Sequence, residues 1–223
     1  MGPRTFDCLI NVSGGVDSTY AAYKYITTTP DENILLHHCE YSKARGPYEK
    51  TAVLKLVEYL KKAGYTNFSL AKFTNWSRAG MPGGINDIIP IYTNTGFLLG
   101  SKKYGAIDKV LMPRCLEEVK SNKSLRSHYN SGKFLNSLTG SNRVAVAMQV
   151  CRTLAKRDIY FFSTYQNLSK KEMLAQLPEH LLQYMWTCRF PKNGKPCGKC
   201  FACRRVKGFN LGTEYATKDY KHG

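Results

Sequence analysis

Short apolar segments alternate with longer amphipathic segments along most of the chain. Apolar or β-branched runs predict buried strands at residues 8–12, 34–42, 68–73, 109–112 and 159–163. Residues 48–65 predict an amphipathic helix, because apolar side chains recur there at helical spacing (Val53, Leu56, Val57 and Leu60). Further helices are predicted in the second half of residues 89–106, at residues 142–154 and from Ser169 onward.

Strands that alternate with helices predict an α/β fold with a parallel sheet, whose ligands bind at the carboxyl ends of the strands. We expect residues 1–165 to form this domain and residues 166–223 to form a C-terminal helical, cysteine-rich region packed on it. Residues 75–87, with three glycines and a proline, and residues 117–131 are predicted to be loops near the ligand-binding face.

The first predicted strand runs directly into residues 13–19, SGGVDST, before a helical segment begins. Gly14 and Gly15 tolerate backbone conformations closed to other residues and let a phosphate approach the main chain. Asp17 and Ser18 occupy positions expected for helix-capping oxygens, and the unpaired N–H groups of a first helical turn favour negative charge. The segment predicts an anion-binding loop; a turn whose glycines serve only packing is the alternative.

Four of the eight cysteines lie close together near the C-terminal end of the sequence. Cys197, Cys200 and Cys203 form a CxxCxxC motif, and Cys188 precedes it by nine residues. Four thiolates that leave no open position are typical of a structural Zn²⁺ site. An iron–sulfur cluster and a set of free buried thiols are the alternatives. The remaining cysteines are predicted to be small core residues (Cys8, Cys39, Cys115 and Cys151).

The composition indicates a folded chain with a strong positive charge. Of its 223 residues, 43% are hydrophobic, and 33 basic against 16 acidic residues give a formal charge of +17. Such a field attracts polyanions, which include nucleic acid as well as ATP and pyrophosphate. No apolar run approaches the roughly 20 residues that cross a bilayer, and the first residues lack the pattern of a secretion signal. We therefore expect a cytoplasmic protein that does not bind membranes.

The SGGVDS string resembles the PP-loop of the ATP pyrophosphatase superfamily, whose pattern is SGGxDS. No GK[ST] follows, as a Walker loop requires, so the resemblance implies cleavage of ATP to AMP and pyrophosphate. Together with the C-terminal cysteines, the loop resembles the 7-cyano-7-deazaguanine (preQ0) synthase family of the queuosine and 7-deazaguanine pathway. This resemblance implies a Rossmann-like, adenine nucleotide alpha hydrolase-like domain with a small C-terminal zinc-binding knuckle.

Other segments match the family less completely. Ser169 and Lys170 resemble its threonine or serine and lysine before a helix, and Trp186-Thr187-Cys188 resembles its TWSC motif. Asn94 lies in a segment similar to VPGRNxxFL, but the arginine of that pattern is missing. The DYSGYPDCR segment, which implies the deazaguanine pocket, lacks its aspartate, cysteine and arginine here. The ATP half of the pattern is therefore intact, whereas the nucleobase half is rewritten.

The resemblance implies a reaction and a set of residues. A carboxylate such as that of 7-carboxy-7-deazaguanine would be adenylated, and ammonia would convert the adenylate to an amide and then to a nitrile. The ATP-binding residues would be Ser13, Gly14, Gly15, Val16, Asp17, Ser18, Thr19 and Asn94. Mg²⁺ would bridge the phosphates, with Asp17 as a direct or water-mediated ligand. The catalytic candidates are Asp17, Ser18, Lys170 and Arg114, and the Zn²⁺ ligands would be Cys188, Cys197, Cys200 and Cys203.

Other readings remain open. A PP-loop enzyme that modifies tRNA or DNA, or adenylates a protein C-terminus, is favoured by the charge and by the missing deazaguanine segment. A non-catalytic module that binds nucleic acid through the knuckle is opposed by the intact SGGVDS string. His37, His38 and His128 are acid–base candidates by pKa alone. The expected partners are a small nucleobase-like carboxylate and ammonia, and the oligomeric state is open, a homodimer included.

Overall fold

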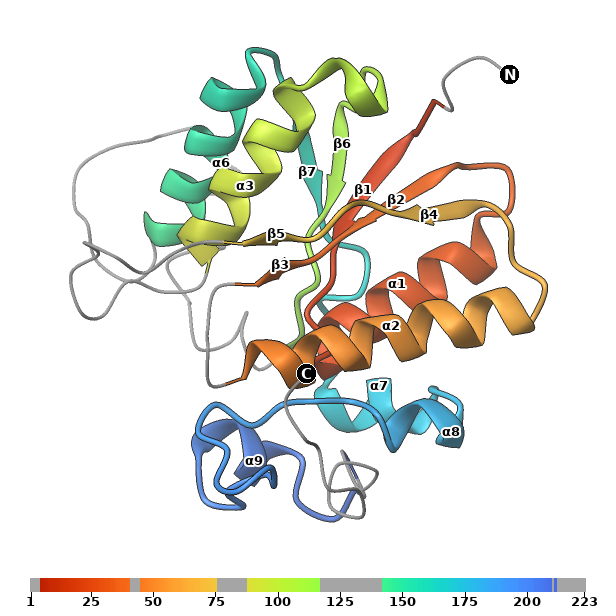
Figure 1. The fold of residues 1–223 in the computed structure, drawn as a ribbon, viewed down its shortest axis with the longest axis vertical. Coiled ribbons are helices and arrows are strands. Elements are labelled where there is room, and N and C mark those ends of the chain that lie inside the picture. The colour runs from red at the N-terminus through yellow and green to blue at the C-terminus, as the bar shows by residue number, and fades with distance from the viewer. Residues whose placement is uncertain (1–4, 41–44, 76–87, 117–141, 210, 212–223) are drawn as a thin grey trace.

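A five-stranded parallel sheet forms the centre of the computed structural model (Figure 1). The structure describes residues 5–40, 45–75, 88–116, 142–209 and 211. In the strand order β4-β2-β1-β6-β7, β1 is central and pairs in parallel with both β2 and β6. The strands are β1 (Cys8–Asn11), β2 (Ile34–His37), β4 (Phe68–Leu70), β6 (Lys109–Leu111) and β7 (Tyr160–Phe162). The predicted α/β class and all five predicted strand positions are confirmed.

The strand predicted at residues 34–42 is shorter in the structure, because the chain leaves the main sheet after His37. Residues 39 and 40 form a separate strand, β3 (Cys39–Glu40), which pairs with β5 (Thr74–Asn75) in a two-stranded sheet. His38 lies between the two strands, and its ring Nδ1 lies 2.8 Å from the carbonyl oxygen of Val12. The apolar pattern does not reveal this change of sheet, since both strands are largely buried.

Two helical layers cover the sheet, one on each face (Figure 1). The first contains α1 (Val16–Thr28) and α2 (Gly46–Lys62), and the second contains α3 (Ile88–Gly100) and α6 (Asn142–Ala155). Alternate side chains of β1 enter the two layers, as expected for a strand. Cys8 and Ile10 pack with α1 and α2, whereas Leu9 packs with α3 and α6. The sheet is therefore buried on both faces.

The predicted helices are confirmed with changes at their ends. α3 begins at Ile88, so the prediction that only the second half of residues 89–106 is helical was wrong. Pro90 falls in the first turn of α3, where its missing N–H has no intrahelical partner to lose. A 3-10 turn, η1 (Lys102–Tyr104), follows α3. Residues 76–87 and 117–131, where loops were expected, lie outside the described residues.

The C-terminal region packs against the first helical layer. Its helices are α7 (Lys170–Ala175), α8 (Glu179–Leu182) and α9 (Phe201–Arg205). Ser169 caps α7 in a reciprocal capping box with Glu172, which explains the predicted helix start. Met173, Leu174 and Leu181 enter the core formed by α1 and α2. No helix in the described part of the chain combines the length and hydropathy of a membrane span.

Glycines let α3 and α6 approach each other closely. A Cβ atom added at Gly96 would lie 2.8 Å from the carbonyl oxygen of Cys151 and 2.8 Å from the Cβ of Leu154. Gly100 meets the carbonyl oxygen of Leu154 in the same way, at 2.6 Å. Because two of these contacts are with backbone atoms, a side chain at either position would push the helices apart.

Gly96→Ala is therefore expected to destabilise the protein, against the usual helix preference. Alanine favours a helix over glycine by about 1 kcal/mol, but overlap with α6 should cost more, for a net loss of roughly 1–3 kcal/mol. Denaturant unfolding measures this change. Phe97→Ala is the control, because Phe97 lies on the same helix and is 59% exposed. Increased stability in Gly96→Ala would contradict the close approach of the helices.

Candidate active site

A cavity of about 470 Å³ lies at the carboxyl end of the sheet. It opens beside β1, at the point where the order of the strands reverses. The chain crosses from β1 to β2 on one side, and the later strand β6 pairs with β1 on the other side. Such switch points form crevices for ligands in open α/β sheets. Residues after β1 and residues after β6, Met112 to Arg114, line the cavity together. Its volume lies within the roughly 300–1,000 Å³ range of small-molecule sites.

The loop between β1 and α1 is held in a conformation that requires glycine. Gly14 has φ +72°, and a Cβ atom there would overlap the Cβ of Ala52 on α2. The carbonyl oxygen of Gly14 accepts a hydrogen bond from the backbone N–H of Trp186 at 2.9 Å. The loop is thus fixed between α2 and the C-terminal region.

The amino end of α1 is open to the cavity. Gly15 is the N-cap residue in an extended conformation, and no side chain caps the helix. The prediction that Asp17 and Ser18 cap it was therefore wrong, because both are already helical residues. Ser18 instead stabilises the loop: its Oγ accepts from the N–H of Ser13 at 3.0 Å. The uncapped helix end and the cavity-lining residues Gly15 to Ser18 form a site suited to an anion.

Asp17 and Lys170 form an ion pair at the cavity wall. Lys170 Nζ donates to Asp17 Oδ2 at 2.6 Å, and the two side chains are 14% and 16% exposed. Lys170 is the first residue of α7, so the capping box at Ser169 helps to position it. Asp17 Oδ1 is buried and has no hydrogen-bond partner among the described residues. One carboxylate oxygen of Asp17 thus remains available to a cation or a bound water.

The charged lining of the cavity is mainly positive. Among the described residues, the carboxylates of Asp17 and Glu49 are outnumbered there by five cationic side chains (Arg45, Arg114, Lys170, Arg189 and Arg205). Arg45 and Glu49 form a buried ion pair, with Nε 3.0 Å from Oε1. This excess of positive charge favours a ligand with several negative charges.

Neither His37 nor His38 is suited to act as a general base. Both are buried, and His37 Nδ1 lies 2.8 Å from Asn11 Oδ1 while Nε2 lies 2.9 Å from Thr74 Oγ1. Burial lowers the pKa of His37 to about 3, and burial also lowers the pKa of His38. Both rings are thus neutral near pH 7 and serve structural roles. His128 lies outside the described residues.

Most residues predicted from the sequence meet in this one cavity, although they come from distant segments. The predicted residues that line it are Ser13, Gly15, Val16, Asp17, Ser18, Arg114 and Lys170. Gly14 positions the loop from behind. Thr19 and Asn94 are not among the lining residues, and the Asn94 amide donates to the carbonyl oxygen of Pro90 within α3. The lining residues Asn11, Arg45 and Arg189 were not predicted from the sequence. Asn11 could have been found, because it is a polar residue within a predicted buried strand.

The four predicted metal-binding cysteines also come together. Their Sγ atoms all lie within 4.8 Å of one another in the knuckle, residues 186–206, so the donor set fits one tetrahedral ion. Backbone N–H groups donate to three of these sulfurs, for example from Cys197 to Cys188 at 3.2 Å. Burial opposes ionisation of Cys200, but hydrogen bonds from the backbone of Arg189 and Cys203 outweigh it and lower its pKa to about 6. A closed set of four sulfurs indicates a structural metal rather than a reactive one.

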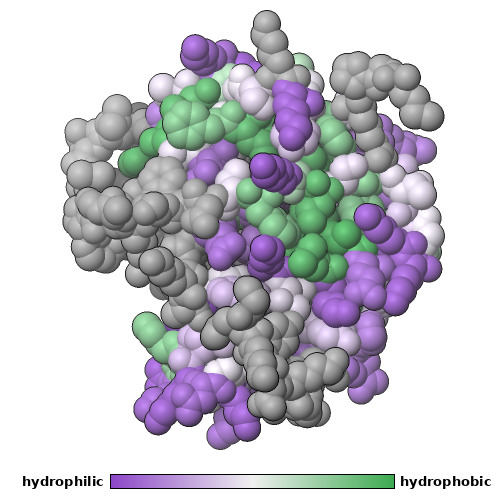
Figure 2. All heavy atoms as spheres, viewed as in Figure 1, coloured by the Kyte–Doolittle hydropathy of each residue, from purple (hydrophilic) through white to green (hydrophobic). Residues whose placement is uncertain are grey.

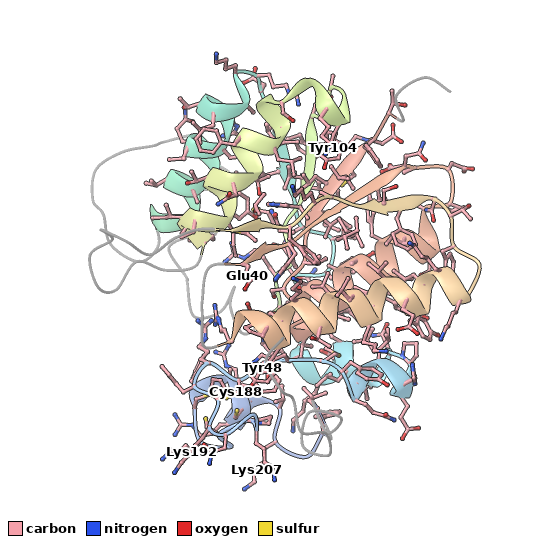
Figure 3. The ribbon with its side chains drawn as sticks, viewed as in Figure 1. Glu40, Tyr48, Tyr104, Cys188, Lys192 and Lys207 are labelled. Carbon is pink, nitrogen blue, oxygen red and sulfur yellow. The ribbon has the colours of Figure 1, made fainter. Side chains whose placement is uncertain are left out.

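The knuckle forms part of the cavity wall. Tyr48 of α2 stacks on Trp186 with ring centroids 4.1 Å apart, and the Trp186 indole N–H donates to the carbonyl oxygen of Cys188 at 3.0 Å. Figure 3 shows Tyr48 directly beside Cys188 at this junction. From the knuckle, Arg189, Phe201 and Arg205 line the cavity. The four-cysteine cluster and the loop between β1 and α1 are therefore parts of one packed structure.

No family model matches the chain. Over 57 residues it is 47% identical to 7-cyano-7-deazaguanine synthase from two serovars of Leptospira interrogans, Copenhageni and Lai. The match covers 23% of this chain and 22% of those proteins, so it spans about a fifth of the length of these curated relatives. A solved structure of the U34-tRNA thiolase NcsA from Methanococcus maripaludis, with its 4Fe-4S cluster, has a TM-score of 0.46 at 13% identity, over 96% of this chain and 71% of that one. The sequence resemblance to 7-cyano-7-deazaguanine synthase is confirmed.

Cys200→Ala is expected to abolish stoichiometric metal binding and to lower the thermal unfolding midpoint. Structural zinc supplies roughly 10 kcal/mol or more in isolated zinc-finger peptides, so even a fraction of this is large for one domain. Elemental analysis identifies the metal, and visible absorbance distinguishes an iron–sulfur cluster from zinc. Cys151→Ala is the control, since Cys151 is buried in the core away from the knuckle. Full metal content in Cys200→Ala would refute the four-cysteine centre.

Proposed function

We propose that the chain is an ATP-dependent, AMP-forming C–N ligase that adenylates a carboxylate and transfers the acyl group to ammonia. The observation that carries the proposal is the Asp17–Lys170 ion pair beside the open amino end of α1 in a positively lined cavity. Helix N–H groups and fixed cations are the groups that stabilise phosphate charge. The sequence relationship to 7-cyano-7-deazaguanine synthase supports this class of reaction.

In this proposal the triphosphate lies across the loop. The N–H groups around Gly15 and Ser18 bind phosphate oxygens, and Lys170 and Arg114 stabilise the departing pyrophosphate. Asp17 Oδ1, buried and without a partner in the described part of the chain, fits a Mg²⁺ ion or one of its waters. Bound Mg²⁺ would neutralise phosphate charge. The residues themselves chiefly position the reactants. Positioning alone can remove a large part of the activation free energy of a reaction between two bound groups.

The proposed reaction has two stages, formation of an amide and then its dehydration. A carboxylate oxygen of the substrate forms a bond to the α-phosphorus as the bond to pyrophosphate breaks. Ammonia then attacks the acyl carbon, AMP leaves, and the amide nitrogen loses a proton. A second ATP can adenylate the amide oxygen with release of pyrophosphate, after which loss of AMP and of both protons of the amide nitrogen gives a nitrile. The carboxylate we propose is 7-carboxy-7-deazaguanine, the substrate implied by the resemblance.

We propose Zn²⁺ for the four-cysteine centre, held by Cys188, Cys197, Cys200 and Cys203. Its role in this proposal is to fix the knuckle, and with it the cavity-lining side chains Arg189 and Arg205. The closed donor set leaves no position for a reactive water, so no catalytic step involves this metal.

The direct test is pyrophosphate release with ATP, Mg²⁺ and ammonium, with and without 7-carboxy-7-deazaguanine, and with the product identified by mass spectrometry. Release that depends on this base, with formation of amide or nitrile, supports the proposal. Absence of turnover by a protein that is folded, metal-loaded and able to bind ATP would exclude this acceptor.

Asp17→Ala is expected to lower pyrophosphate release by about a hundredfold or more, because it removes the partner of Lys170 and the available carboxylate oxygen. Lys170→Ala should have a similar effect. Lys171→Ala is the matched control, since Lys171 is the next residue of α7 and is exposed. Unchanged release in Asp17→Ala, with the fold intact by circular dichroism, would remove the loop from the mechanism.

A second candidate function is modification of a nucleic acid by the same ATP chemistry. It is favoured by exposed aromatic side chains on the knuckle: Phe190 and Phe201 are 71% and 56% exposed. The Arg205 guanidinium lies 3.9 Å from the Phe201 ring centroid, and both side chains line the cavity. Lys192 and Lys207 point outward from the knuckle (Figure 3), and hydrophilic side chains predominate around α9 on the face seen in Figure 2. Aromatic and cationic side chains together are typical of single-strand binding.

If this surface binds RNA, Phe201→Ala should weaken binding of a tRNA by roughly 1–3 kcal/mol, the cost of one lost stacking contact. Filter binding over a series of salt concentrations measures it, since phosphate contacts weaken steeply with salt. Leu54→Ala is the control, because Leu54 is an exposed apolar residue on α2. Equal affinity in the two variants would exclude a stacking role for Phe201.

A further inference from the structure

Asn11 is a polar side chain in the central, fully buried strand of the sheet. It is the last residue of β1, it is 8% exposed, and it lines the cavity. Its amide oxygen Oδ1 lies 2.8 Å from His37 Nδ1 and 3.0 Å from Thr95 Oγ1, whose one proton is shared between Oδ1 and the carbonyl oxygen of Ile91 at 2.9 Å. Its amide nitrogen Nδ2 is buried and has no hydrogen-bond partner in the described part of the chain. A buried donor without a partner costs free energy, so this nitrogen is a candidate ligand contact.

The amide is held in place by its neighbours. Thr95 lies on α3 and His37 ends β2, so Asn11 Oδ1 is fixed from two elements. His37 is in turn held by Thr74 Oγ1 at its other ring nitrogen. With Oδ1 directed toward these partners, Nδ2 is the atom of this cavity-lining side chain that has no partner among the described residues. The orientation is set before any ligand binds, which reduces the entropy cost of the contact.

The cavity around Asn11 differs from the cavity around the loop. Asn11 follows Leu9 on the side of β1 that faces α3 and α6. Among the described residues, the lining on this side consists of His37, whose ring is held by Asn11 and Thr74, and of hydrophobic or aromatic side chains (Ile88, Ile91, Tyr92, Met112 and Val144). The cationic lining residues come from the loop before α2, the segment after β6, α7 and the knuckle. The cavity therefore has a charged half and an apolar half, and Asn11 provides a hydrogen-bond donor in the apolar half.

We propose that the apolar half binds a flat, uncharged heteroaromatic ring, and that Asn11 Nδ2 donates a hydrogen bond to a carbonyl oxygen or ring nitrogen of it. Apolar walls with one oriented donor suit such a ring, whereas phosphate groups suit the charged half. The ring is either the adenine of ATP or the ring of the acceptor substrate. This inference rests on the proposed function, because it assigns part of the same cavity.

Asn11→Asp tests the contact, because it replaces the donor by a second oxygen and keeps an oxygen facing His37 and Thr95. Calorimetry with ATP, inorganic tripolyphosphate and 7-carboxy-7-deazaguanine compares the variant with the unaltered protein. We expect affinity for one ring-containing ligand to fall about tenfold or more, with tripolyphosphate affinity unchanged. Asn33→Asp is the charge-matched control, since Asn33 precedes β2 at the opposite end of the sheet.

Ligand analogues identify the ring and give a second test on the unaltered protein. Deaza-ATP analogues each lack one ring nitrogen, and a base without its exocyclic carbonyl oxygen lacks that acceptor. The atom that Nδ2 contacts is identified when an analogue that lacks it binds the unaltered protein more weakly than the parent ligand does. The same analogue should then bind Asn11→Asp no more weakly than it binds the unaltered protein. Loss confined to ATP analogues assigns the ring to adenine; loss confined to the base assigns it to the acceptor.

Equal affinities for every ring ligand in Asn11→Asp and the unaltered protein, with no effect of the analogues, would overturn the inference while ATP binding still supported the proposed function. Binding retained by Asn11→Asp but lost in Asn11→Leu would also overturn it, because the amide would then be an acceptor. Failure of the unaltered protein to bind ATP would refute the proposed function and this inference together. If Asn11→Asp does not fold, Asn11→Ala takes its place in the same analogue series.

Discussion

The loop between β1 and α1 depends on one close approach and one hydrogen bond. Gly14 packs against Ala52 of α2, where no side chain fits, and its carbonyl oxygen accepts from the N–H of Trp186. Because Gly14 has positive φ, glycine is the residue that satisfies both conditions without strain. The loop is therefore held by a segment that lies far from it in the sequence, and the open end of α1 keeps its place relative to Lys170 and the knuckle.

This arrangement gives the cysteine centre a mechanical connection to the cavity. Cys188 follows Trp186 by two residues, and Trp186 contacts both Gly14 and Tyr48. The knuckle has few large apolar side chains, since its core is a small cluster that consists mostly of these aromatic rings and cysteines. The metal that we propose for this centre would supply, through four fixed bonds, the rigidity that so small a core lacks.

Local patterns were sufficient to predict the strands, most helices and the two motifs, because each depends on residues close in the sequence. Contacts between distant segments were not accessible in this way. Asp17 and Lys170 are 153 residues apart, and the ion pair between them follows from the packing of α7 on α1. Asn94 does not line the cavity for the same reason. Within α3 its amide donates to the carbonyl oxygen of Pro90, and the spacing of residues in the sequence does not reveal this contact. The separation of β3 from β2 depends on β5, a partner of two residues.

The distribution of charge bears on which acceptor the cavity serves. Five cationic side chains of the described residues line it, whereas the whole chain has 33 basic residues and a formal charge of +17. Binding ATP requires only the local set, because its charge lies within a few ångströms of the loop and the field of distant surface charges is screened over about 8–10 Å in salt. The remaining excess is thus not explained by ATP. A small carboxylate does not require it either, whereas a nucleic acid that extends from the cavity across the knuckle would pass cationic side chains such as Arg205, Lys192 and Lys207. In the proposed function, the ATP chemistry therefore rests on the loop and its ion pair, whereas the choice of acceptor depends on features outside them, the surface of the knuckle included.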